Sequence, residues 1–157
     1  MNIVRSLLLS AMLSVPLCGV ASAADTPLPF ANNLPQLAVA SAKQGLPLIL
    51  MVSMTGCRFC EKIRREHLAP LAKSGVPVWQ IHLDTEAKVI GFNGQPVSEK
   101  QLAKELKVRV APTVMFFDAQ GRRLAEPLVG TMLDDFYAAY LGDAITESRK
   151  KLAARKQ

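Results

Sequence analysis

The sequence predicts an α/β protein with a central mixed sheet flanked by helices. Two apolar runs of strand length, 48–53 and 113–117, are separated by segments with helical patterns, and strands alternating with helices are typical of an α/β sheet. A third run, 76–83, lies between them. The tight turn 118–121 joins the last two predicted strands, which indicates an antiparallel edge.

The N-terminal half of the predicted domain alternates helix and strand. Residues 34–43 carry apolar side chains at helical spacing. The run 48–53 is continuously apolar, which is typical of a strand buried on both faces of a sheet. It leads into Cys57, after which 58–68 has a charged helical pattern that Pro70 is expected to bend or end.

The C-terminal half contains the remaining strands. Residues 76–83 form the second predicted strand, and 85–97 contain an Asn-Gly turn that predicts a loop or small hairpin. A capping-box pattern predicts a helix over 98–106. After the strand 113–117, a fourth strand is expected near 122–129.

The last predicted element is an amphipathic helix. Five apolar side chains fall at helical spacing on one face, namely Leu133, Phe136, Tyr137, Tyr140 and Leu141. Residues 143–157 are rich in lysine and arginine, and we interpret them as a basic tail, the solvated and fraying end of this helix. The tail lacks interleaved aromatic residues, so no nucleic-acid partner is expected.

The first 23 residues have the pattern of a secretory signal peptide. Arg5 gives a positively charged start, 6–20 is mostly apolar, and Ala21-Ser22-Ala23 has the small-x-small pattern that signal peptidases cleave. The apolar run is too short and too interrupted for a membrane span. We therefore expect cleavage after Ala23 or Ala24 and export of the remaining chain.

Lipid attachment at Cys18 is an alternative for the leader. It is disfavoured because Leu17 stands where a small residue normally precedes a lipidated cysteine. Removal of residues 1–23 takes away Arg5 and lowers the formal net charge from +6 to about +5. The remaining 134 or so residues suit one compact domain over 24–142, followed by the tail over 143–157.

Two cysteines remain outside the leader, Cys57 and Cys60. A bridge between them would close too short a loop to constrain the unfolded chain, so its value must be chemical. Cys57 is predicted at the start of a helix, where unpaired backbone N–H groups and the positive end of the dipole favour a thiolate. Arg58 adds a cation, reinforced by others along the helix, Arg64 among them. We therefore predict that Cys57 attacks disulfides and that Cys60, one turn deeper, resolves the mixed disulfide.

Other uses of this cysteine spacing fit less well. A structural zinc site needs four ligands, and haem attachment needs a histidine directly after the second cysteine, where this chain has Glu61. Copper binding by the cysteines with Met51 or Met54 stays open as an alternative. No resident cofactor or metal is expected. Phe59 should be exposed at the tip of the helix, where it and Arg58 can contact partners.

From Pro47 to about Leu141 the chain resembles thioredoxin, in its exported bacterial form, the SoxW-type periplasmic thioredoxin-like proteins. The matching segments are the strand 48–53, the Cys57–Cys60 motif, the strand ending at Asp84, Val108–Thr113 and the hairpin 116–121. The resemblance implies a thioredoxin fold with the cysteine pair at the N-terminus of a helix. It also implies a periplasmic location.

The same resemblance assigns roles to Ala111 and Pro112. In that family the proline at the position of Pro112 follows a cis peptide bond and lies against the cysteine pair. The residue before it, here Ala111, offers backbone hydrogen bonds to an extended substrate segment.

The resemblance implies a thiol–disulfide oxidoreductase. Its partners would be disulfides of exported proteins and a membrane thiol-reductant donor, so that the protein works mainly in the reducing direction, and we expect a monomer. A disulfide-forming oxidase and a non-catalytic module that holds copper or a client protein are the alternatives.

The chain departs from the thioredoxin pattern in the length of the segment 85–97, which is longer than in plain thioredoxin, and at several single positions. Gly56 stands where thioredoxins usually have tryptophan, and Arg58-Phe59 replaces the usual Gly-Pro between the cysteines. Met51 occupies the place of a buried aspartate, and Gln80 replaces its lysine partner on the next strand. A carboxylate at the first of these buried positions helps to move the proton of the resolving thiol, so that assistance is expected to be missing.

Overall fold

The centre of the fold is a four-stranded mixed sheet. The computed structural model describes residues 27–131 and 136–155, and the strand order is β2-β1-β5-β6. The strands are β1 (Leu48–Ser53), β2 (Val78–His82), β5 (Thr113–Phe117) and β6 (Leu128–Val129). β1 is parallel to β2 and antiparallel to β5, and β6 adds the antiparallel edge. The predicted α/β class with a mixed sheet is confirmed, and β1 and β5 have the predicted bounds.

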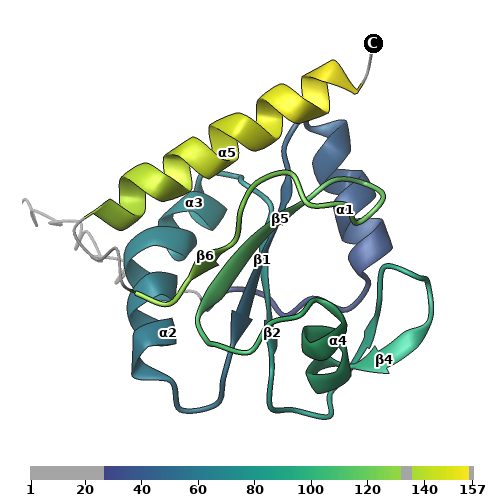
Figure 1. Cartoon of the computed structure of the whole chain (residues 1–157), viewed down its shortest axis with the longest axis vertical. Helices are drawn as coiled ribbons and strands as arrows, with labels where there is room; N and C mark the ends of the chain where they lie inside the picture. Colours follow the sequence, from purple (N-terminus) through teal and green to yellow (C-terminus); the bar gives the residue numbers. More distant parts are fainter. Residues whose placement is uncertain (1–26, 132–135, 156–157) are drawn as a thin grey trace, which may run out of the picture.

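Helices pack on both faces of this sheet (Figure 1). One face is covered by α1 (Leu34–Lys43) and α4 (Glu99–Glu105). The other is covered by α2 (Arg58–Ile63), a π-helical turn η1 (Arg64–Leu68), α3 (Ala69–Lys73) and α5 (Tyr137–Ala154). β3 (Lys88–Ile90) and β4 (Pro96–Ser98) form a separate antiparallel hairpin, as the Asn-Gly turn predicts.

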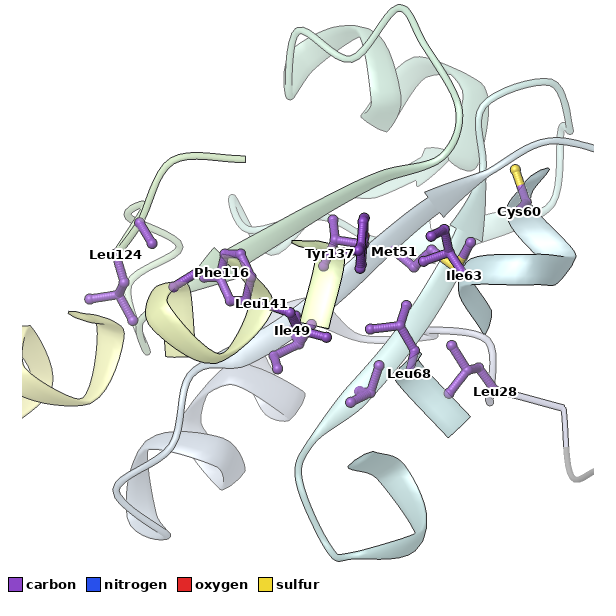
Figure 2. Packing of buried hydrophobic residues seen from close by; sticks show 14 of the residues in the cluster. Leu28, Ile49, Met51, Cys60, Ile63, Leu68, Phe116, Leu124, Tyr137 and Leu141 are labelled. Carbon is purple, nitrogen blue, oxygen red and sulfur yellow. The ribbon is translucent and has the colours of Figure 1, made fainter. Parts of the chain in front are cut away.

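The side chains of β1 alternate between two hydrophobic clusters. Ile49 and Met51 belong to the cluster under α2 and α5, whereas Leu48 and Leu50 belong to the cluster under α1 and α4. Because both faces are covered, every residue of β1 is buried, which explains its continuous apolar run. Figure 2 shows the first cluster, which also contains Cys60.

The helix that follows the cysteines does not end at Pro70. It passes through the π-helical turn η1 and continues as α3, with Pro70 in the first turn of α3. The N–H of Ala69 donates to the carbonyl of Arg64, five residues back. Proline lacks an N–H and its ring crowds the carbonyl four residues earlier, and the wider π turn accommodates both effects.

The predicted apolar stripe of the last helix is only partly correct. Tyr137 and Leu141 are buried, but Phe136 and Tyr140 are 66% and 45% exposed. Leu133 lies outside the described residues. The remaining buried positions of α5 are Ala144, Ser148 and Leu152. Small residues at these positions let the helix lie close to the sheet. A search for large apolar side chains at helical spacing does not detect such positions.

Residues 143–154 are the end of the last helix, as expected, and most of their side chains are exposed. They continue α5 without interruption, however, so the expected boundary at 142 falls inside the helix. Leu152 is buried in the same hydrophobic cluster as the cysteines. The hydroxyl of Ser148, which is also buried, donates to the carbonyl of Ala144 at 2.7 Å and so satisfies its own polarity.

Residues 27–31 add a short extended segment to the free edge of β2. Phe30 forms a parallel bridge with Gln80, whose carbonyl accepts the N–H of Ala31 at 2.9 Å. The predicted signal peptide over 1–23 and its cleavage sites lie outside the described residues. Among the helices that the structure describes, none has the length and apolar character needed to cross a membrane.

Candidate active site

Cys57 and Cys60 form a disulfide at the start of α2, with their Cα atoms 5.2 Å apart. Cys57 is the N-cap of this helix, and its Sγ accepts the N–H of Cys60 at 3.1 Å. Cys57 is 8% exposed and Cys60 is 1% exposed. The sulfur of Cys57 therefore occupies the place where a capping oxygen normally accepts an unpaired N–H group, an environment that favours negative charge on it.

The loop that carries Cys57 is fixed to the end of β2. Both carboxylate oxygens of Asp84 lie 3.2 Å from the backbone nitrogen of Thr55, which donates to them. Gly56 has a φ of +68°, in the left-handed region that side chains disfavour. This conformation gives a physical reason for the glycine where thioredoxins usually carry tryptophan.

The peptide bond between Ala111 and Pro112 is cis, as the resemblance implies. Ala111 packs against the hydrophobic cluster that contains both cysteines. The carbonyl of Pro112 accepts the N–H of Gly130 at 2.7 Å, which ties this turn to β6. Within the described parts of the chain, no backbone hydrogen bond uses the N–H or the carbonyl of Ala111.

Arg58 and Phe59 lie on the surface between the two cysteines. The ring of Phe59 is exposed, as predicted, and the guanidinium carbon of Arg58 lies 4.7 Å from its centroid. A cation over an aromatic face at this distance is attracted by the ring. The pair therefore forms an amphipathic rim beside the disulfide.

A buried polar network stands beside the position of the missing aspartate. Met51 is fully buried, and its neighbour in the β1–β2 register is Gln80. Arg64 donates from Nε to Oε1 of Gln80 at 2.9 Å and from Nη2 to Oγ of Ser53 at 3.0 Å. Gln80 in turn donates to the carbonyl of Leu28 at 2.6 Å.

This network differs from the sequence-based expectation for Arg64. Arg64 was expected to reinforce the positive charge near Cys57, but its side chain turns toward the sheet and donates hydrogen bonds to residues of β1 and β2. The one available signal was the pair of polar residues Ser53 and Gln80 within apolar strands. Buried polar groups need partners, and a nearby arginine can supply several donors.

No three His, Cys, Asp or Glu side chains gather as possible metal ligands anywhere in 27–131 or 136–155. Met51 packs in the core, whereas Met54 is exposed beside the cysteine loop. The predicted site residues that the structure brings together are the two cysteines, the dipeptide between them, and Ala111 against their cluster.

The strand order and the cysteine pair at the head of α2 define a thioredoxin fold. A family model described as a thioredoxin-like domain matches residues 34–145, and the chain belongs to this family. A CxxC pair on this fold is the arrangement of thiol–disulfide oxidoreductases in general.

Solved structures with the same fold have little sequence identity to the chain. A thioredoxin-fold protein from Helicobacter pylori is 18% identical, with a TM-score of 0.51 over 76% of this chain and 90% of its own. Oxidised mitochondrial thioredoxin 3 from Saccharomyces cerevisiae is 20% identical, with a TM-score of 0.51 over 76% of this chain and 94% of its own. Comparison with curated protein sequences gave no match. These likenesses concern the fold alone.

Proposed function

We propose that this protein is a periplasmic thiol–disulfide oxidoreductase that exchanges disulfides with exported proteins, mainly in the reducing direction. The observation that carries the proposal is the Cys57–Cys60 disulfide at the head of α2, with the less buried cysteine at the N-cap. The export signal predicted over 1–23 supports the location. A membrane thiol-reductant donor would return the pair to its reduced form.

The reaction begins from the reduced pair. The Cys57 thiolate attacks one sulfur of the substrate disulfide, forms a mixed disulfide and releases the other substrate sulfur as a thiolate. Cys60 then loses its proton and attacks Sγ of Cys57, which re-forms the Cys57–Cys60 disulfide and releases the second substrate thiol. Two electrons pass from the cysteine pair to the substrate. The donor supplies two electrons and two protons to complete the cycle.

Several groups around the pair are suited to hold a polypeptide substrate. The free N–H and carbonyl of Ala111 can pair with an extended segment, in the manner of an added strand. Phe59, Met54 and Val110 are exposed apolar side chains on the segments that flank the cysteines and the cis proline. Arg58 adds a positive charge to this surface.

The reducing direction is the one that the resemblance to exported thioredoxin-like proteins implies, and the helix effect on the redox potential is too small to reverse it. A helix N-terminus favours the thiolate by roughly 0.3–1 kcal/mol, and about 1.4 kcal/mol corresponds to 30 mV for a two-electron couple. Stabilising the thiolate makes the disulfide more oxidising, but only by about 6–20 mV. This is too little to convert a reductant of the thioredoxin type into a strong oxidant.

Insulin reduction driven by dithiothreitol tests the proposal, together with titration of the reduced protein by Cu(I). We expect catalytic turnover that is lost in Cys57→Ser. Absence of turnover combined with stoichiometric retention of copper would instead support a non-catalytic binding module.

A further inference from the structure

A cavity of about 310 Å³ lies beside α2, apart from the cysteine pair. Most of its lining residues come from α2 and η1, from β2, and from the segment 27–31 on the edge of that strand. Its polar wall is made by Glu61, Arg64, Arg65, Gln80 and His82, and Phe30 forms an apolar side. Neither cysteine lines it, so its occupancy and the redox reaction can be measured separately.

Arg64 is the buried cation of this wall. A guanidinium has five N–H donors. Three donors of Arg64 are used: Nε contacts Gln80, Nη2 contacts Ser53 and Nη1 contacts Glu61. Among the described contacts, one N–H on each terminal nitrogen is therefore unused. The ion-pair partner Glu61 has a side chain that is 67% exposed. The carboxylate of Glu61 can therefore move away from Arg64 into solvent.

His82 and Phe30 form the opposite side. Their rings meet edge to face with centroids 5.0 Å apart. The backbone N–H of His82 donates to Glu99, but among the described residues its imidazole makes no hydrogen bond. The imidazole is therefore available to a molecule in the cavity, next to an aromatic face.

The charge of the wall favours an anion. The lining of the cavity contains two arginines and one glutamate. Arg65 is also paired with Glu66, which lies outside the lining, at 3.0 Å. A carboxylate matches the planar fork of arginine better than a spherical anion does, because two parallel hydrogen bonds can form. The apolar side chain of Phe30 favours a ligand in which an aromatic ring or hydrocarbon group is attached to the carboxylate.

We propose that this cavity binds a small aromatic carboxylate, with its carboxylate on Arg64 and His82 and its ring against Phe30. Glu61 occupies the anion position when the cavity is empty of ligand, and the ligand's carboxylate displaces it. Binding is thus a competition between an external carboxylate and one that belongs to the protein.

Calorimetric titration of the oxidised protein with phenylacetate tests the proposal, with NMR signals of the His82 ring followed in parallel. We expect saturable binding to one site, which shifts the His82 signals. Phenylacetamide has the same shape without the charge, and should bind about tenfold more weakly. Acetate, which lacks the ring, should also bind more weakly. Equal binding of phenylacetate and phenylacetamide, or no saturation, would overturn the proposal.

Variants of exposed residues keep the test independent of folding. Glu61→Gln removes the competing carboxylate and should tighten phenylacetate binding several-fold, whereas Phe30→Ala and Arg65→Gln should weaken it. Lys104→Gln on α4, which lies on the opposite face of the sheet, removes a positive charge elsewhere and should leave binding unchanged. Affinity that is insensitive to both Glu61→Gln and Phe30→Ala would contradict the assignment, whatever the redox activity proves to be.

Discussion

The carboxylate of Asp84 accepts the backbone N–H of Thr55, across the gap between the end of β2 and the loop that carries Cys57. Leu83 makes a second link, since its N–H donates to the carbonyl of Ser53 at 2.9 Å. The position of Cys57 is therefore set by the neighbouring parallel strand as well as by α2. Residues outside the helix that carries the cysteine pair can in this way determine where the sulfur of Cys57 lies.

Replacement of Asp84 by alanine should loosen this loop. A hydrogen bond to a charged group contributes roughly 1.5–3 kcal/mol, and this exposed one should contribute no more than the lower end of that range. We expect several-fold slower disulfide exchange and faster amide hydrogen exchange at Thr55. Asp143→Ala, which removes an exposed carboxylate from α5, is the matched control. Unchanged exchange at Thr55 would show that the carboxylate does not hold the loop.

Hydrophobic patterns in the sequence predicted the elements that are buried along their whole length. β1 and β5 were predicted to the residue because central strands of a covered sheet are apolar throughout. The cysteine motif was identified because its short loop has no structural purpose. The face of α5 was predicted only in part, because Ala144 and Ser148 pack as well as larger residues but give no hydrophobic signal.

Features that depend on long-range contacts had no local signal. The bond between Gln80 and the carbonyl of Leu28 joins residues 52 positions apart. The contact between Arg64 and Gln80 depends on how α2 packs over β2. The π turn before Pro70 was equally hidden, since proline in a helical pattern more often marks its end.

Asp118 should make the stability of the fold depend on pH. Burial opposes its ionisation, but hydrogen bonds from the backbone and side chain of Arg122 and from the N–H of Gln120 outweigh that effect and lower its pKa. Arg155, at the end of α5, also donates to this carboxylate. A lowered pKa in the folded state adds stability above the unfolded pKa of about 4, and this stability is lost as pH falls through the folded value.

Urea unfolding at pH 7 and pH 3 measures this contribution. Asp118→Asn should lower the free energy of unfolding at pH 7 by roughly 1–3 kcal/mol, because the donors around this buried position lose a charged acceptor. The variant should also lose less stability between the two pH values than the parent protein does. Asp143→Asn is the control for an exposed acid. Identical pH dependence of Asp118→Asn and the parent would contradict the assignment.

The redox potential distinguishes a reductant from an oxidase. Equilibration of Cys57–Cys60 with glutathione should give a value between about −270 and −180 mV, the range from thioredoxin to disulfide isomerases. The reason is that the helix N-terminus shifts the potential only modestly. A value near about −120 mV, together with isolation of the protein fully as the disulfide, would favour the disulfide-forming oxidase.

Trapping of the mixed disulfide tests the central claim most directly. The Cys60→Ser variant retains the proposed attacking sulfur but lacks the proposed resolving one, so it should remain covalently bound to a disulfide substrate. Peptide mapping by mass spectrometry should place the adduct on Cys57, and Cys57→Ser should form none under the same conditions. An adduct formed by Cys57→Ser through Cys60, or no adduct with either variant, would contradict the account.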